Sequence, residues 1–96
     1  MPAVTRIGDA DVAHCSGMTR AVGSGDVFAN GLGVSRQDDV NTSHLLPPAP
    51  CPSHSAPIAV GSTTVFTNGK GTGRVGDAIS GCTSVAAGSP TVFAGP

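Results

Sequence analysis

The chain has 96 residues, enough for one small domain, and only 11% of them are charged, with a formal net charge of −1. Its five basic residues are dispersed and no apolar stretch approaches the roughly 20 residues of a membrane span, so the sequence predicts neither a nucleic-acid-binding surface nor a transmembrane segment. With 14 Gly, 8 Pro and three Phe as the only aromatic residues, a large apolar core is excluded, and such a domain usually needs a disulfide framework or a metal.

Cysteine usage favours the metal. Three cysteines are an odd number, which speaks against a closed disulfide framework. Residues 1–9 lack the charged-then-apolar pattern of a secretory signal, so we expect cytoplasmic synthesis without a signal peptide. In a reducing compartment a thiolate metal ligand is favoured over a disulfide bridge.

The first predicted element is residues 1–14. It contains the sequence TRIGDADVAH, which ends on His14 eight residues after Arg6. Gly and Asp after Ile7 mark a turn, because both residue types are common in turns. This element matches only the second half of the units that follow it in the chain.

Residues 23–44 form the first whole unit, GSGDVFANGLGVSRQDDVNTSH. A short β-prone run around Phe28 ends in Asn-Gly, which is a strong hairpin signal. Arg36 follows Phe28 by eight residues, and His44 follows Arg36 by eight. Because no window shows sustained helical periodicity, we expect short strands and turns throughout.

Residues 45–60 form an insert, LLPPAPCPSHSAPIAV. It has 16 residues, whereas the matching segment between His14 and Gly23 has eight. The insert is therefore long enough to return a side chain to the centre of the molecule. Cys51 and His54, which lie in it, have a spacing common in metal sites.

Residues 61–82 repeat the first whole unit without a gap, as GSTTVFTNGKGTGRVGDAISGC, and end on Cys82. Residues 88–96, GSPTVFAGP, match the first half of a third unit, whose second half is residues 1–14. A repeat that is cut inside one unit requires the chain termini to meet. The sequence therefore predicts one all-β domain over residues 1–96, with three units of short β-hairpins in pseudo-threefold symmetry.

The last residue of each unit suggests a metal site. Under threefold symmetry, His14, His44 and Cys82 occupy matching positions around one axis, which predicts three converging ligands. Tetrahedral zinc takes a fourth ligand, and His54 of the insert is the remaining histidine. Three His and one Cys would close the coordination sphere, so we expect one structural zinc whose binding energy contributes to folding.

Two other cysteines compete with Cys82. Cys51 is the main rival because of its spacing to His54, but the repeat phase favours Cys82. Cys15 directly follows His14. Neighbours on a strand point to opposite faces, so the two cannot easily face the same axis.

Further residue types recur at matching positions. The simplest interpretation of the three Phe is that they belong to the core, and the alternative is that they also form an apolar base for a partner. Each repeated Arg is followed three residues later by Asp, which we interpret as a turn with a local ion pair of small value. The sets are Phe28, Phe66 and Phe93; Arg6, Arg36 and Arg74; and Asp9, Asp39 and Asp77.

The elements GS..VF.NG and R.GD, followed by His or Cys, resemble the PAAR-repeat family over nearly the whole chain. The Pro-Ala-Ala-Arg motif itself is replaced by Ala-Val-Thr-Arg at 3–6, Gly-Val-Ser-Arg at 33–36 and Gly-Thr-Gly-Arg at 71–74. The resemblance implies a small cone of three β-hairpin units with a zinc near the apex. The ligands that it carries over are His14, His44, His54 and Cys82.

Members of this family cap the tip of contractile injection machines, so the resemblance implies a structural tip and not an enzyme. The implied partner is the homotrimeric spike protein of type VI secretion systems (VgrG) or the related phage tail spike, with one chain per trimer. The protein would then lie at the tip of the apparatus, to be secreted into a target cell or carried in a virion. No residues remain for a fused effector, so we expect any effector to bind separately. A small zinc hydrolase and a metal-free β interaction module are the alternative functions.

Overall fold

The computed structural model describes residues 2–13, 17–42, 44–45 and 53–95, with residues 44, 45, 53 and 54 described by their backbone alone. Strands but no helices occur among these residues, which confirms an all-β fold. The strands form three two-stranded antiparallel ladders, β1–β2, β3–β4 and β5–β6. Their bounds are Phe28–Ala29 (β1), Leu32–Gly33 (β2), His44–Leu45 (β3), Ser53–His54 (β4), Phe66–Thr67 (β5) and Lys70–Gly71 (β6).

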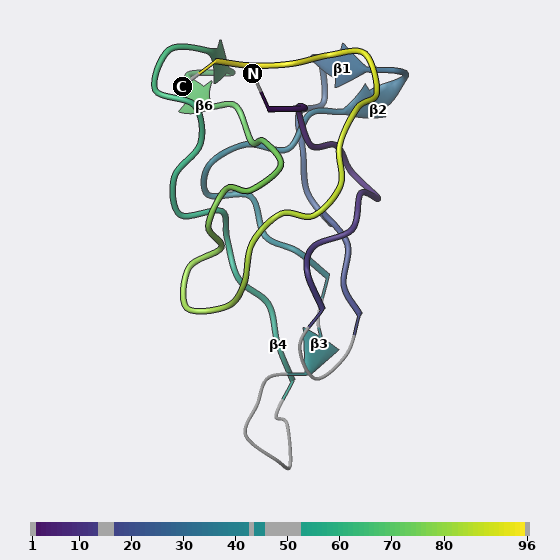
Figure 1. Cartoon of the computed structure of the whole chain (residues 1–96), viewed down its shortest axis with the longest axis vertical. Coiled ribbons are helices and arrows are strands. Elements are labelled where there is room, and N and C mark those ends of the chain that lie inside the picture. Colours follow the sequence, from purple (N-terminus) through teal and green to yellow (C-terminus); the bar gives the residue numbers. More distant parts are fainter. Residues whose placement is uncertain (1, 14–16, 43, 46–52, 96) are drawn as a thin grey trace.

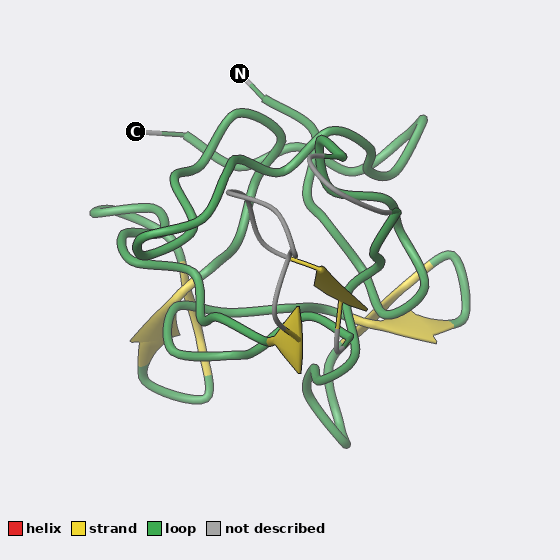
Figure 2. Ribbon diagram, turned by 90° about the horizontal axis from the view of Figure 1, so that it is seen from below, coloured by secondary structure: helices red, strands yellow, loops and turns green. Residues whose placement is uncertain are grey.

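The molecule is elongated, with principal extents of 38 × 23 × 20 Å. The β1–β2 hairpin and β6 lie at one end of the long axis, whereas β3 and β4 lie toward the other (Figure 1). Figure 2 looks along this axis and shows the chain wound around it, with the two ends of the described chain near each other. Isolated bridges, antiparallel except for Gln37–Ile58, join the windings of the described chain along the body of the molecule.

Asn-Gly turns close two of the hairpins, as the sequence predicts. Asn30 and Gly31 connect β1 to β2 with φ angles of 54° and 79°. Asn68 and Gly69 connect β5 to β6 with φ angles of 54° and 77°. Positive φ at both turn residues is the type I′ geometry, whose twist matches that of the flanking strands.

The chain ends are joined by backbone hydrogen bonds at the same end of the molecule. Phe93 forms an antiparallel bridge with Ala3, as the first residues of β1 and β5 do with their partner strands. The N–H of Ala94 donates to the carbonyl of Pro2 at 3.0 Å. The segments near residues 3 and 93 therefore pair in the way that the two intact hairpins do.

A Gly-Ser pair opens each of the three repeated units, or copies, and each of its two residues has its own structural role. Each Ser hydroxyl accepts hydrogen bonds from the backbone N–H groups two and three residues further on, at 2.9–3.2 Å, which fixes a tight turn. Each Gly lies against the backbone of the paired strand, so that a Cβ at Gly61 would stand 2.4 Å from the carbonyl oxygen of Gly71. These serines are Ser24, Ser62 and Ser89.

The core consists of two small apolar clusters inside the windings, as expected for a chain with so few large side chains. One lies beside the hairpins and the other lies further along the molecule. The first contains Val4, Ala29, Val34 and Ala94. The second contains Ala56, Ile58, Ile79 and Val85.

The interpretation of the three Phe as core residues is wrong. The exposed fractions are 58%, 60% and 48% for Phe28, Phe66 and Phe93. Successive residues of a strand point to opposite faces, and here the inward face is occupied by the small residue that follows each Phe. These buried residues are Ala29, Thr67 and Ala94.

The first whole copy, residues 23–44, has Gln37 and Asp38 where the other two copies have an aliphatic residue and Gly, and the structure accommodates both changes. Asp38 has a φ of 77°, at a position where Gly8 and Gly76 both have 91°. Asp is among the few residues with a side chain that adopt this conformation at modest cost. The carboxamide oxygen of Gln37 accepts a hydrogen bond from the N–H of Gly61 at 3.3 Å, so its polar side chain has a partner.

Candidate functional site

Two of the four predicted zinc ligands lie on paired strands. His44 of β3 is directly opposite His54 of β4 in the antiparallel register. Residues opposed in this way share one face of a two-stranded ladder. The backbone therefore brings these two histidine positions together across the insert. Outside the described residues lie His14, Cys15 and Cys51.

Cys82, the fourth predicted ligand, borders the second apolar cluster and is partly buried. Burial raises the pKa of its thiol, and a hydrogen bond with the side chain of Asn41 opposes this effect. The N–H of Cys82 donates to the carbonyl of Ile79 at 3.0 Å, which fixes the turn that carries the thiol.

Among the side chains that the structure describes, no three of His, Cys, Asp or Glu gather into a metal site. Three of the predicted ligands are not among those side chains, so the complete zinc set stays a prediction. The donor types fit zinc, since imidazole and thiolate are its preferred ligands. The pairing of β3 with β4 also fits, because it draws two of the donor positions together.

A buried polar cluster lies next to Cys82. Arg20 and Asp11 form an ion pair with Nε–Oδ2 at 3.4 Å, and both side chains are fully buried. The side-chain amide of Asn41 donates to Asp11 Oδ2 at 3.2 Å. Burial lowers the pKa of Arg20, and the charge of Asp11 works in the opposite direction.

This cluster is not apparent from residue types, among which Arg20 is only one of five dispersed basic residues. A signal was present in the repeat. Arg20 stands three residues before the Gly-Ser pair of its copy, and Asp11 and Asn41 each stand five residues after a repeated Arg. The residues at the corresponding positions of the other copies are buried and aliphatic, namely Ile58 and Val85 for Arg20, and Ile79 for Asp11 and Asn41.

The repeated Arg and Asp residues form bidentate pairs that fix the turns between them. Each guanidinium donates to both oxygens of its carboxylate at 2.7–3.2 Å. One carboxylate oxygen also accepts the backbone N–H of the same Arg at 2.8 Å, so each Asp side chain bonds the turn backbone as well as the guanidinium. The pairs are Arg6–Asp9, Arg36–Asp39 and Arg74–Asp77.

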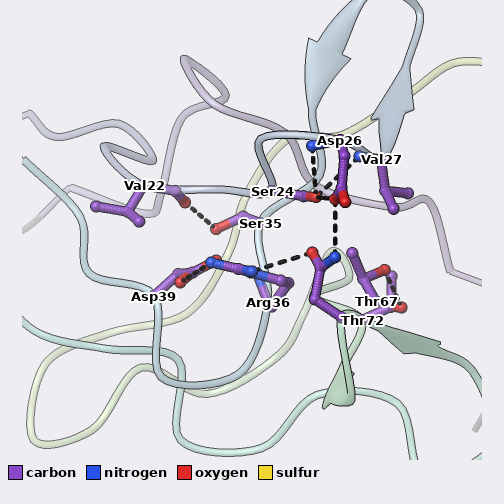
Figure 3. Close-up of polar contacts among 10 residues, drawn as sticks. Val22, Ser24, Asp26, Val27, Ser35, Arg36, Asp39, Thr67 and Thr72 are labelled. Atoms are coloured by element: carbon purple, nitrogen blue, oxygen red, sulfur yellow. Dashed lines mark hydrogen bonds and ion pairs between the residues drawn. The ribbon is translucent and has the colours of Figure 1, made fainter.

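The Nη1 atom of each of these Arg residues donates to a neighbouring copy, either to a hairpin turn or to the matching segment at residue 95, a contact that the sequence does not reveal. The acceptors are Asn30 Oδ1 for Arg6 at 3.0 Å, Asn68 Oδ1 for Arg36 at 3.1 Å and the Gly95 carbonyl for Arg74 at 2.8 Å. Asn68 in turn donates to Asp26 at 2.8 Å, and the bonds from Asn68 and Ser24 lower the pKa of Asp26. Figure 3 shows Arg36 with Asp39 and the polar contacts around Ser24 and Asp26. The three bonds tie the hairpins into a closed ring.

Apolar side chains are exposed on these hairpins and on the pairing segment near residue 93. Each exposed Phe is preceded by a Val that is also exposed. We call this set the docking face, and it consists of Val27, Phe28, Val65, Phe66, Val92 and Phe93. Exposed apolar side chains that recur at matching positions of a repeat are candidates for an interaction surface.

A model of the PAAR motif family matches residues 49–95. The chain belongs to the PAAR-repeat family. The PAAR match spans the second whole copy and the Gly-Ser half-copy that follows it, and residues 23–44 repeat the former without a gap. The PAAR motif is associated with spike-tip proteins of type VI secretion systems, a structural class rather than an enzyme class. No curated protein matches this PAAR-repeat chain. In its described part, no helix is long and apolar enough to cross a membrane.

Proposed function

We propose that this PAAR-repeat protein is the structural tip of the spike in a contractile injection machine, and that it binds the end of the trimeric spike through the docking face. The observation that supports this function is the exposure of Phe28, Phe66 and Phe93 at matching positions of the three copies. Three equivalent apolar contacts on one chain are complementary to the end of a homotrimer, which offers each contact once per subunit. Such a cap would also cover the strand edges at the end of the trimer.

In this proposal one zinc, bound by His14, His44, His54 and Cys82, cross-links the part of the molecule that includes β3 and β4. Closed coordination by four protein side chains leaves no position for a reactive water, so the metal would supply rigidity rather than catalysis. The ring of Arg bonds would stiffen the hairpin end in the same way. A stiff cone of this kind transmits force from the spike and aids puncture of a target envelope, and an effector could attach to it non-covalently.

Replacing all three Phe by Ser is expected to weaken binding to a trimeric VgrG-type spike at least about 100-fold. Each substitution removes an apolar side chain whose burial is worth on the order of 1.5–3 kcal/mol. Because these side chains are exposed in the isolated protein, folding should be little affected. Affinity is measured by biolayer interferometry, and native mass spectrometry is expected to give one wild-type chain per trimer.

Val12→Ser provides the control, because Val12 is 47% exposed but lies outside the docking face. This variant should bind the spike as wild type does. Equal binding by wild type and the triple Phe variant would exclude the docking face. Binding of three chains per trimer would exclude a cap with internal threefold repetition.

Protein purified without chelator is expected to contain one zinc per chain by elemental analysis. Cys82→Ser and His54→Ala should lose the metal because each removes one of four ligands, whereas Cys51→Ser should retain it. A wild-type protein without metal would exclude the zinc site and would favour the alternative of a metal-free β interaction module. Loss of zinc with Cys51→Ser but not with Cys82→Ser would show that Cys51 of the insert, and not Cys82, is the thiolate ligand.

A further inference from the structure

Asn41 has an unusual position among the buried polar residues. Its side chain is 1% exposed, and its carboxamide joins three separate segments of the chain. The oxygen accepts the backbone N–H of Ala56 at 2.9 Å, and the nitrogen donates to Asp11 Oδ2 at 3.2 Å. The same side chain forms a hydrogen bond with Cys82.

These contacts lie close in the sequence to all four predicted zinc ligands. One contact, Cys82, is itself a predicted ligand, and Ala56 and Asp11 lie two and three residues from predicted ligands. The amide nitrogen also donates to the sulfur of Met18 at 3.4 Å, four residues beyond His14. Ala56 follows His54 by two residues, Asp11 precedes His14 by three, and Asn41 precedes His44 by three. A single carboxamide therefore links every segment that would supply a donor.

The orientation of this carboxamide is fixed. Its oxygen and its nitrogen both have protein partners, and a rotation would leave buried polar atoms unsatisfied, which is costly. Asp11 is in turn paired with Arg20, whose backbone forms an antiparallel bridge with Asn41. The corresponding residue in the other whole copy, Ile79, is also buried, so packing at this position does not by itself require an amide.

We propose that Asn41 is a positioning residue for the zinc site, which orients the sulfur of Cys82 and sets the spacing of the histidine-bearing segments. This inference rests on the zinc site of the proposed function. Partners of metal ligands fix the direction of the donor atoms, and their removal typically weakens metal binding 10–100-fold. The same range is expected for loss of the Asn41 carboxamide.

The test compares the full-length wild-type protein with Asn41→Ala and Asn41→Ile. Asn41→Ile keeps most of the side-chain volume and reproduces the residue of the matching position, so it serves if the Ala variant does not fold. Zinc affinity is measured by competition with a chromophoric chelator. Cobalt(II) substitution reports the sulfur ligand through its thiolate-to-metal charge-transfer absorption. Thermal unfolding in EDTA gives the stability of the metal-free chain separately.

Ser35→Ala is the matched control. Ser35 is also fully buried and also donates to another segment, to the carbonyl of Val22 at 2.9 Å, and it lies in the part of the core shown in Figure 3. Its side-chain hydrogen bond among the described residues goes to this carbonyl and not to Cys82. The Ser35→Ala variant should lower the stability of the metal-free chain and leave zinc affinity unchanged. Both Asn41 variants should lose zinc affinity 10–100-fold and show a weaker or shifted charge-transfer band.

Wild-type zinc affinity and an unchanged cobalt spectrum in both Asn41 variants would overturn the inference and reduce Asn41 to a core residue, while the zinc site itself would stand. A wild-type protein that binds no zinc would overturn the zinc site and this inference together. The two failures are therefore distinguished by the wild-type measurement.

Discussion

Replacing Arg20 by Met is expected to lower the free energy of unfolding by about 3–5 kcal/mol, because it leaves the carboxylate of Asp11 buried without its cation. Both side chains are fully buried in the ion pair. Met fills much of the same volume as the Arg stem, so the loss would reflect the uncompensated charge more than a cavity. Urea unfolding of the metal-free chain measures the effect without a contribution from zinc.

Combining Arg20→Met with Asp11→Ile should recover part of that loss, and the bond from the Asn41 amide to Asp11 Oδ2 is lost in exchange. Buried ion pairs can be replaced by apolar residues at little cost, because desolvation consumes most of their attraction. Here the guanidinium nitrogens of Arg20 lack hydrogen-bond partners in the described structure, so the pair is poorly satisfied. The double variant also introduces the aliphatic character that Ile58 and Ile79 have at the corresponding positions. A double variant as unstable as Arg20→Met would show that the ion pair stabilises the fold on its own account.

The features that could be predicted from the sequence are those set by local chemistry. An Asn-Gly pair adopts the type I′ turn because both residues accept positive φ, and the hairpins around Asn30 and Asn68 follow from that. The bonding of Asp9 to turn backbone is equally local, since the partner is three residues away. The exposure of Phe28 is not local. It depends on which face of a two-residue strand points inward, and that face is chosen by the neighbouring copies.

The candidate site likewise has one part that the sequence predicts and another that it does not. The repeat phase alone selects His14, His44 and Cys82, and the structure pairs His44 with His54 across the insert. The polar cluster around Arg20 could not be recognised from residue type, since a lone Arg in a small domain is normally exposed. Only its position, at a place where the other copies bury an aliphatic residue, distinguishes it. The difference becomes visible when the repeat is aligned to include the three residues before each Gly-Ser pair, because Arg20 then stands opposite Ile58 and Val85.

Replacing Gly61 by Ala is expected to lower the free energy of unfolding by at least about 3 kcal/mol, at the upper end of overpacking effects. A Cβ there would lie 2.4 Å from the carbonyl oxygen of Gly71 and 2.9 Å from that of Thr72. Both atoms belong to backbone, which is held in place because the N–H of Ser62 donates to the carbonyl of Thr72 at 2.9 Å. Relief of the clash would therefore require the paired strand to move and its hydrogen bonds to lengthen. Thermal and urea unfolding both measure the loss.

Two other Gly-to-Ala variants separate this clash from the general effects of the substitution. A Cβ at Gly25 meets nothing within 4 Å, so Gly25→Ala should leave stability unchanged or raise it by up to about 1 kcal/mol through the unfolded chain. A Cβ at Gly31 also has open space, but the φ of 79° is unfavourable for Ala, so Gly31→Ala should cost on the order of 1–2 kcal/mol. If Gly61→Ala proves no worse than Gly31→Ala, the strands can separate without loss, and close backbone contact is not what the repeated Gly-Ser pair provides. If Gly61→Ala is far worse, the recurrence of Gly at the start of every copy follows from packing between strands rather than from turn conformation.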